Sequence, residues 1–152
     1  MGPRIARTLS YICYLTTLRI MLTVKDFCNE DPPTLLLMGV AQFNRGEFFQ
    51  QHETLEELWN NEARDVRRLY QGILQIGVAM YHITKNNHHG AVYMATKGSN
   101  YLRPFVPSCQ TVDVSNLLEQ ATRILKELGH LGPGNLDKFN WSLSPRVRIV
   151  EK

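Results

Sequence analysis

The sequence predicts an all-α protein, a compact bundle of four to six helices with a central antiparallel helix hairpin. Three observations support this fold class: apolar residues recur every three or four positions, prolines and glycines separate these stretches, and no segment alternates like a strand for long. Of the 152 residues, 43% are apolar and 20% are charged, which is typical of one globular domain.

Two helices are predicted first. Pro32 and Pro33 can open a helix over residues 34–44, TLLLMGVAQFN, and Gly46 can end it. The next stretch, GEFFQQHETLEELW, is amphipathic. Its apolar positions are Phe48, Phe49, Leu55 and Trp59, and its other side carries Gln50, Glu53 and Glu57.

Residues 67–85, RRLYQGILQIGVAMYHITK, are apolar nearly all round, so we expect the central buried helix there. A short polar turn separates this helix from the preceding one, so the two should be antiparallel. A further helix, GAVYMATKGSNYLRPF, should end at Pro104 and Pro107. Asp113 can cap the last helix, which runs along an apolar stripe to residue 128.

These elements divide the chain into a basic N-terminal extension at residues 1–24, a helical domain at 33–130 and an irregular tail at 131–152 that packs through Trp141. The extension has no acidic residue and is too short and polar to span a bilayer. Its composition resembles an organelle transit peptide, and a secretory signal less closely. We expect instead that Met21 is the true start and that the preceding residues are a leader.

The cysteines, Cys13, Cys28 and Cys109, are far apart and form no CxxC pair. This spacing suggests neither a zinc knuckle nor a disulfide framework and favours a reducing compartment. We therefore predict a cytoplasmic protein, or one of an organelle stroma if the extension is a transit peptide. Nucleic acid is not an expected partner, because Arg64, Arg67 and Arg68 are interleaved with acidic residues. A membrane is not expected either, because the extension cannot span one.

One polar group on the helical hairpin needs an explanation. His52 and Glu56 fall on the apolar side of their helix, and Gln71 and Gln75 share one side of the central helix. Antiparallel pairing places Glu56 opposite Gln71 and His52 opposite Gln75. Burial of these groups is costly unless they form hydrogen bonds, and glutamine can both donate and accept. Gly72 and Gly77 permit a close helix approach, and Arg67 or Arg68 could pair with Glu56.

The same residues carry a resemblance to a known family. The pattern is Phe43-Asn44-x-Gly46-x-Phe48-Phe49-x-x-His52-Glu53-x-Leu55-Glu56-x-x-Trp59, then Tyr70-Gln71-Gly72-Ile73-Leu74-Gln75, then His82, then Asn87-x-x-Gly90-Ala91. It resembles the small helical family labelled domain of unknown function 309, over residues of about 35 to 105. Asn86 stands where the pattern has glycine. The resemblance implies an all-helical fold and a polar set, but no agreed activity. The candidate site residues are His52, Glu53, Glu56, Trp59, Gln71, Gln75, His82 and Asn87.

The sequence is most consistent with an interaction or structural module that holds a buried polar cluster, with an unknown protein partner or self-association. The alternative is a hydrolase-like or metal-binding enzyme in which His52 acts as a general base and Glu56 orients it. Neither Glu-x-x-His nor HExxH occurs, and the adjacent His88 and His89 would chelate poorly. No metal and no cofactor are therefore predicted.

Overall fold

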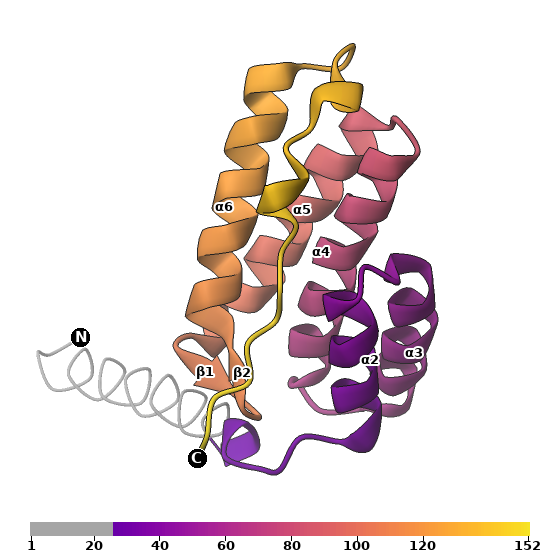
Figure 1. Cartoon of the computed structure of the whole chain (residues 1–152). Coiled ribbons are helices and arrows are strands. Elements are labelled where there is room, and N and C mark those ends of the chain that lie inside the picture. The colour runs from indigo at the N-terminus through magenta and orange to yellow at the C-terminus, as the bar shows by residue number, and fades with distance from the viewer. Residues whose placement is uncertain (1–25) are drawn as a thin grey trace, which may run out of the picture.

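The computed structural model describes residues 26–152 and confirms the predicted all-α class (Figure 1). The predicted extension at residues 1–24 and Cys13 lie outside the described residues. The main helices are α2 (Thr34–Asn44), α3 (Phe48–Asn61), α4 (Arg67–Thr84), α5 (His88–Leu102) and α6 (Val114–Leu131). Short 3₁₀ helices are η1 (Arg103–Phe105), which follows α5, and η2 (Leu136–Lys138) and η3 (Trp141–Leu143), which follow α6.

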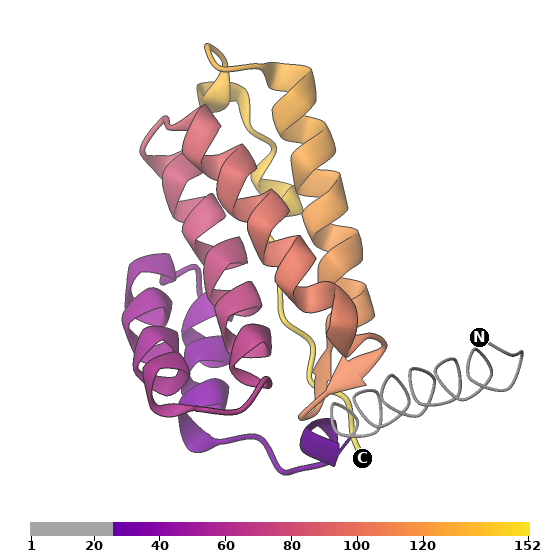
Figure 2. The same cartoon turned by 180° about the vertical axis from the view of Figure 1, so that it is seen from behind.

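The long helices α4, α5 and α6 lie side by side, and α2 and α3 cover the lower part of α4 (Figures 1 and 2). Helix α4 packs against both α3 and α5, which makes it the centre of the bundle. It is buried nearly all round, as its apolar sequence predicted. No helix within residues 26–152 has both the length and the apolar character needed to cross a membrane.

Helix α3 shows its buried stripe at Phe48, Gln51, Leu55 and Leu58. The spacing of three and four residues is that of one helical face, as predicted. Phe49, which the sequence placed among the apolar positions, is 52% exposed and lies against the Tyr81 ring instead. The reason is angular: Phe49 follows Phe48 by about 100° around the helix and so leaves the buried stripe.

Glycine allows α4 and α5 to approach closely. A Cβ atom at Gly72 would lie 2.7 Å from Leu102 Cγ, and one at Gly98 would lie 2.9 Å from the Gly72 carbonyl oxygen. Such distances leave no room for a side chain. The close approach expected at Gly72 is therefore present, and its partner is α5.

A β-hairpin that the sequence did not reveal precedes α6. Strands β1 (Ser108–Cys109) and β2 (Val112–Asp113) pair antiparallel across Gln110 and Thr111. Both turn residues have positive φ, at 45° and 66°, as in a type I′ turn. Two-residue strands are too short to produce an alternating pattern, which is why the sequence gave no signal. The cap predicted at Asp113 is present, because its Oδ1 accepts a hydrogen bond from the Asn116 backbone N–H.

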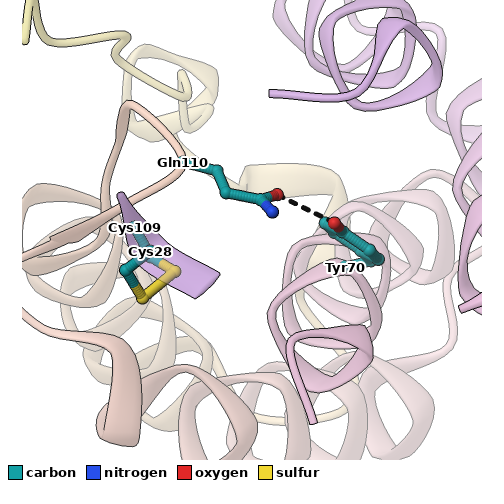
Figure 3. Close-up of a disulfide and its surroundings, with 4 residues drawn as sticks. All are labelled: Cys28, Tyr70, Cys109 and Gln110. Carbon is teal, nitrogen blue, oxygen red and sulfur yellow. Dashed lines mark hydrogen bonds between the residues drawn. A yellow bond between two sulfur atoms is a disulfide. The ribbon is translucent and has the colours of Figure 1, made fainter. Parts of the chain in front are cut away.

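The hairpin is tied to the N-terminal part of the described chain by a disulfide between Cys28 and Cys109 (Figure 3). The cysteine spacing, which suggested no disulfide framework, therefore gave no sign of this bond. The two residues are 81 positions apart, and such a distance in sequence says nothing of their proximity in the fold. The Gln110 backbone N–H also donates to the Cys28 carbonyl oxygen at 2.8 Å, so two different bonds hold the same junction.

The tail after α6 returns along the bundle to the hairpin (Figure 1). It packs through the buried side chains of Leu136, Phe139 and Val147. Trp141, the expected anchor, contacts the Phe139 ring but is 47% exposed. The tail is thus an ordered part of the fold, with an isolated β-bridge between Val112 and Ile149.

Two carboxamide side chains bind the tail backbone from opposite helices. Asn44, at the end of α2, donates to the Val147 carbonyl oxygen at 2.9 Å and accepts from the Val147 N–H at 2.7 Å. Gln120 of α6 donates to the Arg146 carbonyl oxygen at 2.8 Å and accepts from the Arg146 N–H at 2.9 Å. Each amide reproduces the donor–acceptor pair of a neighbouring strand, so residues 146–147 link α2 to α6.

Candidate functional site

A small cleft lined by both polar and apolar side chains opens where α3 and α4 meet, and Met94 of α5 also lines it. Its volume is about 170 Å³. We call it the α3–α4 cleft, and its lining residues are His52, Glu56, Trp59, Gln71, Leu74, Gln75, Val78 and Met94. The structure thus brings together five of the eight candidate residues, from the two helices of the hairpin.

The histidine–glutamate pair lines the cleft from α3 and is half-exposed. His52 Nε2 lies 3.8 Å from Glu56 Oε2, one helical turn away, and the two side chains are 39% and 46% exposed. The expectation that both groups are buried is therefore wrong. His52 and Glu56 lie beside the buried stripe that contains Leu55 and Leu58, at the border between the buried and the exposed side of α3. The separation exceeds a hydrogen bond, so the pair is a loose one.

Gln75 forms the buried wall of the cleft. The residue is 6% exposed, and its Oε1 has no hydrogen-bond partner among residues 26–152. An unsatisfied buried acceptor of this kind costs about 1–3 kcal/mol. Gln71, one turn earlier on α4, is only half-buried and lines the same space. The Gln75 Oε1 atom has almost no accessible surface, so a group that enters the cleft does not contact it directly.

Trp59 closes one side of the cleft and is covered by a cation. The guanidinium carbon of Arg67 lies 4.9 Å from the centroid of the Trp59 ring. The sequence had suggested Arg67 or Arg68 as a partner of Glu56, but Arg67 faces the aromatic ring instead. Its Nε is buried and has no hydrogen-bond partner among the described residues.

The register of the α3–α4 helical hairpin is fixed by Gln51, a residue that sequence reasoning missed. The fully buried Gln51 side chain donates from Nε2 to the Leu74 carbonyl oxygen at 3.1 Å. It lies against Gly77, where a Cβ atom would be 2.2 Å from Gln51 Nε2. Two signals could have found it: Gln51 falls on the 48–55–58 stripe, and a glycine inside a helix can mark a close approach.

His82 and Asn87 do not join the cleft but form a second group at the α4–α5 turn. Asn87 caps α5 by accepting from the Gly90 N–H at 2.9 Å, and its Nδ2 lies 3.2 Å from His82 Nδ1. A Cβ at Gly90 would lie 2.7 Å from Asn87 Nδ2. Asn86 has a φ of 56°, so it adopts the backbone for which glycine was expected. The eighth candidate, Glu53, is exposed and lines no part of the cleft.

The other histidines make local contacts. His88, expected in a loop, is the first residue of α5, and its Nε2 lies 2.7 Å from the Leu128 carbonyl oxygen of α6. His89 is exposed beside it. Within residues 26–152, no three histidine, cysteine, aspartate or glutamate side chains are grouped so that they could hold a metal ion.

The comparison with protein families agrees with the resemblance seen in the sequence. Residues 36–94 match the model of the family described as Domain of unknown function (DUF309). The matched segment begins in α2 and ends in α5 at Met94, so it contains every residue that lines the cleft. No curated protein matches the chain.

Proposed function

We propose that this chain, whose residues 36–94 match the DUF309 family model, is an interaction module that binds a partner protein through the α3–α4 cleft. The observation that supports it is a set of polar side chains that line the cleft without bonding across it. Within residues 26–152, Gln75 makes no side-chain hydrogen bond, and His52 and Glu56, at 3.8 Å, form only a loose pair. A partner group that enters the cleft would meet the half-exposed His52 and Glu56 side chains, which have hydrogen-bonding capacity to spare.

The size of the cleft favours a protein partner over a small-molecule substrate. Sites for drug-sized ligands and cofactors span about 300–1,000 Å³ and bury most of the ligand. The α3–α4 cleft has about 170 Å³ and two half-exposed residues in its lining. It therefore suits one side chain that projects from a larger surface.

A purely structural role has less support. A polar network that specifies helix packing needs its members to satisfy one another. Within residues 26–152, neither Gln71 nor Gln75 makes a side-chain hydrogen bond across the hairpin, whereas Gln51 makes the bond that sets the register. Gln51 therefore sets the register of α3 against α4, and the cleft residues are not needed for it.

The enzymatic alternative keeps His52 as general base and Glu56 as its orienting group. A base and its orienting group are expected within about 2.6–3.2 Å of each other, although unliganded sites can be looser. The 3.8 Å separation and the lack of serine, threonine, cysteine, lysine or tyrosine in the lining lend it little support.

The test compares partner capture with stability. Tagged chain with Gln75→Leu should lose partners that the unchanged chain retains, while its free energy of unfolding should stay equal or rise, because an unpaired acceptor is removed. Gln50→Leu makes the same chemical change at an exposed position of α3 outside the cleft and should retain those partners. Light scattering on the same samples identifies a partner that is a second copy of the chain. If Gln75→Leu keeps every partner, or loses stability as a structural residue would, the proposal is wrong.

The disulfide also bears on the cellular compartment. The cysteine spacing was the main argument for a cytoplasmic location, and the Cys28–Cys109 bond removes it. Because disulfides persist mainly in oxidising compartments, we infer that the protein works where thiols are oxidised. Alkylation of the protein from its native source, before and after reduction, tests this inference: two further thiols should react after reduction.

A further inference from the structure

We propose that the Cys28–Cys109 disulfide is a site of thiol–disulfide exchange, at which a small thiol forms a mixed disulfide with Cys28 and releases residues 26–31. We call these six residues, which precede α2, the N-terminal clasp. The exchange site shares no lining residue with the α3–α4 cleft, so it stands apart from the proposed function.

The two cysteines differ in their access to solvent. Cys28 is half-buried and lines a pocket of about 370 Å³, which is within the range of about 300–1,000 Å³ for small-molecule sites. The other lining residues are Asn29, Ser108, Thr111, Val150, Glu151 and Lys152. Cys109 is 1% exposed and does not line this pocket. A small thiol that enters the pocket therefore meets Cys28 and not Cys109.

The exchange is a displacement at sulfur. A small thiolate attacks the Cys28 sulfur and forms a new S–S bond with it, while the bond between Cys28 and Cys109 breaks. The electron pair leaves on the Cys109 sulfur, and the resulting thiolate takes a proton from water. A second small thiolate then attacks the sulfur of the bound thiol. Cys28 leaves as a thiolate, and the two small thiols are joined as a disulfide.

The quality of the leaving group favours the opposite direction of attack. A buried thiolate is poorly solvated and leaves less easily, and Cys109 is the more buried of the two cysteines. Attack at Cys109, however, needs a path through the buried residues among which it packs. Access therefore decides that the thiol attacks Cys28, and the exchange should be slower than at a disulfide with two exposed sulfurs.

The hairpin side of the disulfide should stay in place after reduction. The Tyr70 hydroxyl donates to Gln110 Oε1 at 2.8 Å inside the core, which holds the hairpin turn to α4 (Figure 3). The bridge between Val112 and Ile149 joins the second strand of the hairpin to the tail. Neither contact involves the clasp or depends on the disulfide.

The clasp has weaker ties to the rest of the chain. All of its residues are exposed or half-buried. Glu30 pairs with Arg64, whose guanidinium lies 5.0 Å from the centroid of the Phe27 ring, and Asp31 pairs with Lys152. The side chains of these two ion pairs are 43–93% exposed, and exposed pairs contribute little to stability. Once the disulfide is broken, the clasp should therefore open while the helical bundle stays folded.

The first test maps the mixed disulfide on the full chain. Free thiols are blocked with N-ethylmaleimide, the blocking reagent is removed, and reduced glutathione is added. Acid stops the exchange before trypsin digestion and mass spectrometry. The glutathione adduct should lie on the peptide of residues 26–45, which contains Cys28, about tenfold more often than on that of residues 98–123, which contains Cys109. In urea, where the fold no longer covers Cys109, both peptides should carry the adduct.

The second test follows the clasp by ¹⁵N relaxation. After reduction and alkylation, the order parameter of the Asn29 amide should fall below about 0.6, while that of Ile73 in α4 should stay near about 0.85. Glu30→Gln in the oxidised chain removes the ion pair with Arg64 but leaves the disulfide, so the Asn29 amide should remain as rigid as in the unchanged chain.

The proposal is overturned if the adduct lies mainly on the Cys109 peptide, or if millimolar glutathione reacts in urea but not with the folded chain. It is equally overturned if the clasp stays rigid after reduction, or if Ile73 becomes as mobile as Asn29. Loosening of the clasp by Glu30→Gln in the oxidised chain would show that the ion pair, and not the disulfide, holds it.

Discussion

The Tyr70 hydroxyl on α4 donates a hydrogen bond of 2.8 Å to Gln110 Oε1, at the turn of the β-hairpin (Figure 3). Both residues are fully buried. The bond joins the centre of the bundle to the hairpin that also carries the disulfide. A polar side chain at the tip of a strained turn is thereby held inside the core.

Replacing Tyr70 with phenylalanine should lower the free energy of unfolding by about 1–3 kcal/mol. The ring still fills its space, but Gln110 Oε1 loses its donor, while Gln110 Nε2 already has no partner in the described residues. Urea denaturation measures the loss. Tyr93→Phe makes the same change on an exposed residue of α5 and should have no effect, so equal losses at both positions would contradict the assignment.

The same tyrosine should make stability depend on alkaline pH. Burial raises the pKa of Tyr70 to about 12, above the value of about 10 for an unfolded tyrosine. The folded state therefore favours the protonated phenol. This contribution is complete below pH 10 and is lost as pH rises from about 10 to 12. Unfolding curves across this window should show the unchanged chain losing its advantage over Tyr70→Phe, and a constant difference between the two would refute the shift.

Breaking the Cys28–Cys109 disulfide should cost about 2–5 kcal/mol, because it closes a long loop of the unfolded chain. Cys28→Ser should unfold at a lower denaturant concentration than the unchanged chain. A dithiol reductant should bring the unchanged chain to the midpoint of the variant and leave the variant where it is. A reductant that shifts both proteins equally would mean that some other bond is responsible.

Gly77→Ala should destabilise the protein by about 1–3 kcal/mol, since its methyl group would overlap the Gln51 amide at 2.2 Å. Gly129→Ala is the matched control on α6. Nothing lies within 4 Å of its added Cβ, so the better helix propensity of alanine should stabilise the protein by about 0.5–1 kcal/mol. Thermal denaturation should therefore give shifts of opposite sign. A gain for both variants would show that the two helices do not meet at Gly77.

Asn44→Ala should release the tail locally without unfolding the bundle. The Val147 N–H loses its acceptor and should exchange with deuterium faster, whereas the Arg146 N–H keeps its bond to Gln120. Gln120→Ala should reverse this pattern. Hydrogen exchange followed by NMR resolves the two amides, and equal acceleration of both in either variant would mean that the tail opens as one unit.

The helices and several of their boundaries could be predicted because their causes are local. The prolines before α2, the positive φ of Gly46 and Asn86, and the Asp113 cap act within a few residues of themselves. The pairing of α3 with α4 was also predictable, because a short turn leaves two apolar faces little choice. The cleft residues followed from the same periodicity, together with the family motif.

Other features depend on which distant segments meet, and periodicity carries no such information. The exposure of His52 and Glu56 depends on how far the neighbouring helices extend over them. Gln51 is buried because Gly77 leaves space for it on another helix.

The sequence alone determined the helical class, the hairpin and the set of polar residues on its inner side, because hydrophobic periodicity and capping are written in neighbouring positions. Only the tertiary structure decided that these residues form an open cleft, that Cys28 bonds Cys109, and that the tail is bound by Asn44 and Gln120. Each of these depends on contacts between residues that are distant along the chain, which arise when the whole bundle packs.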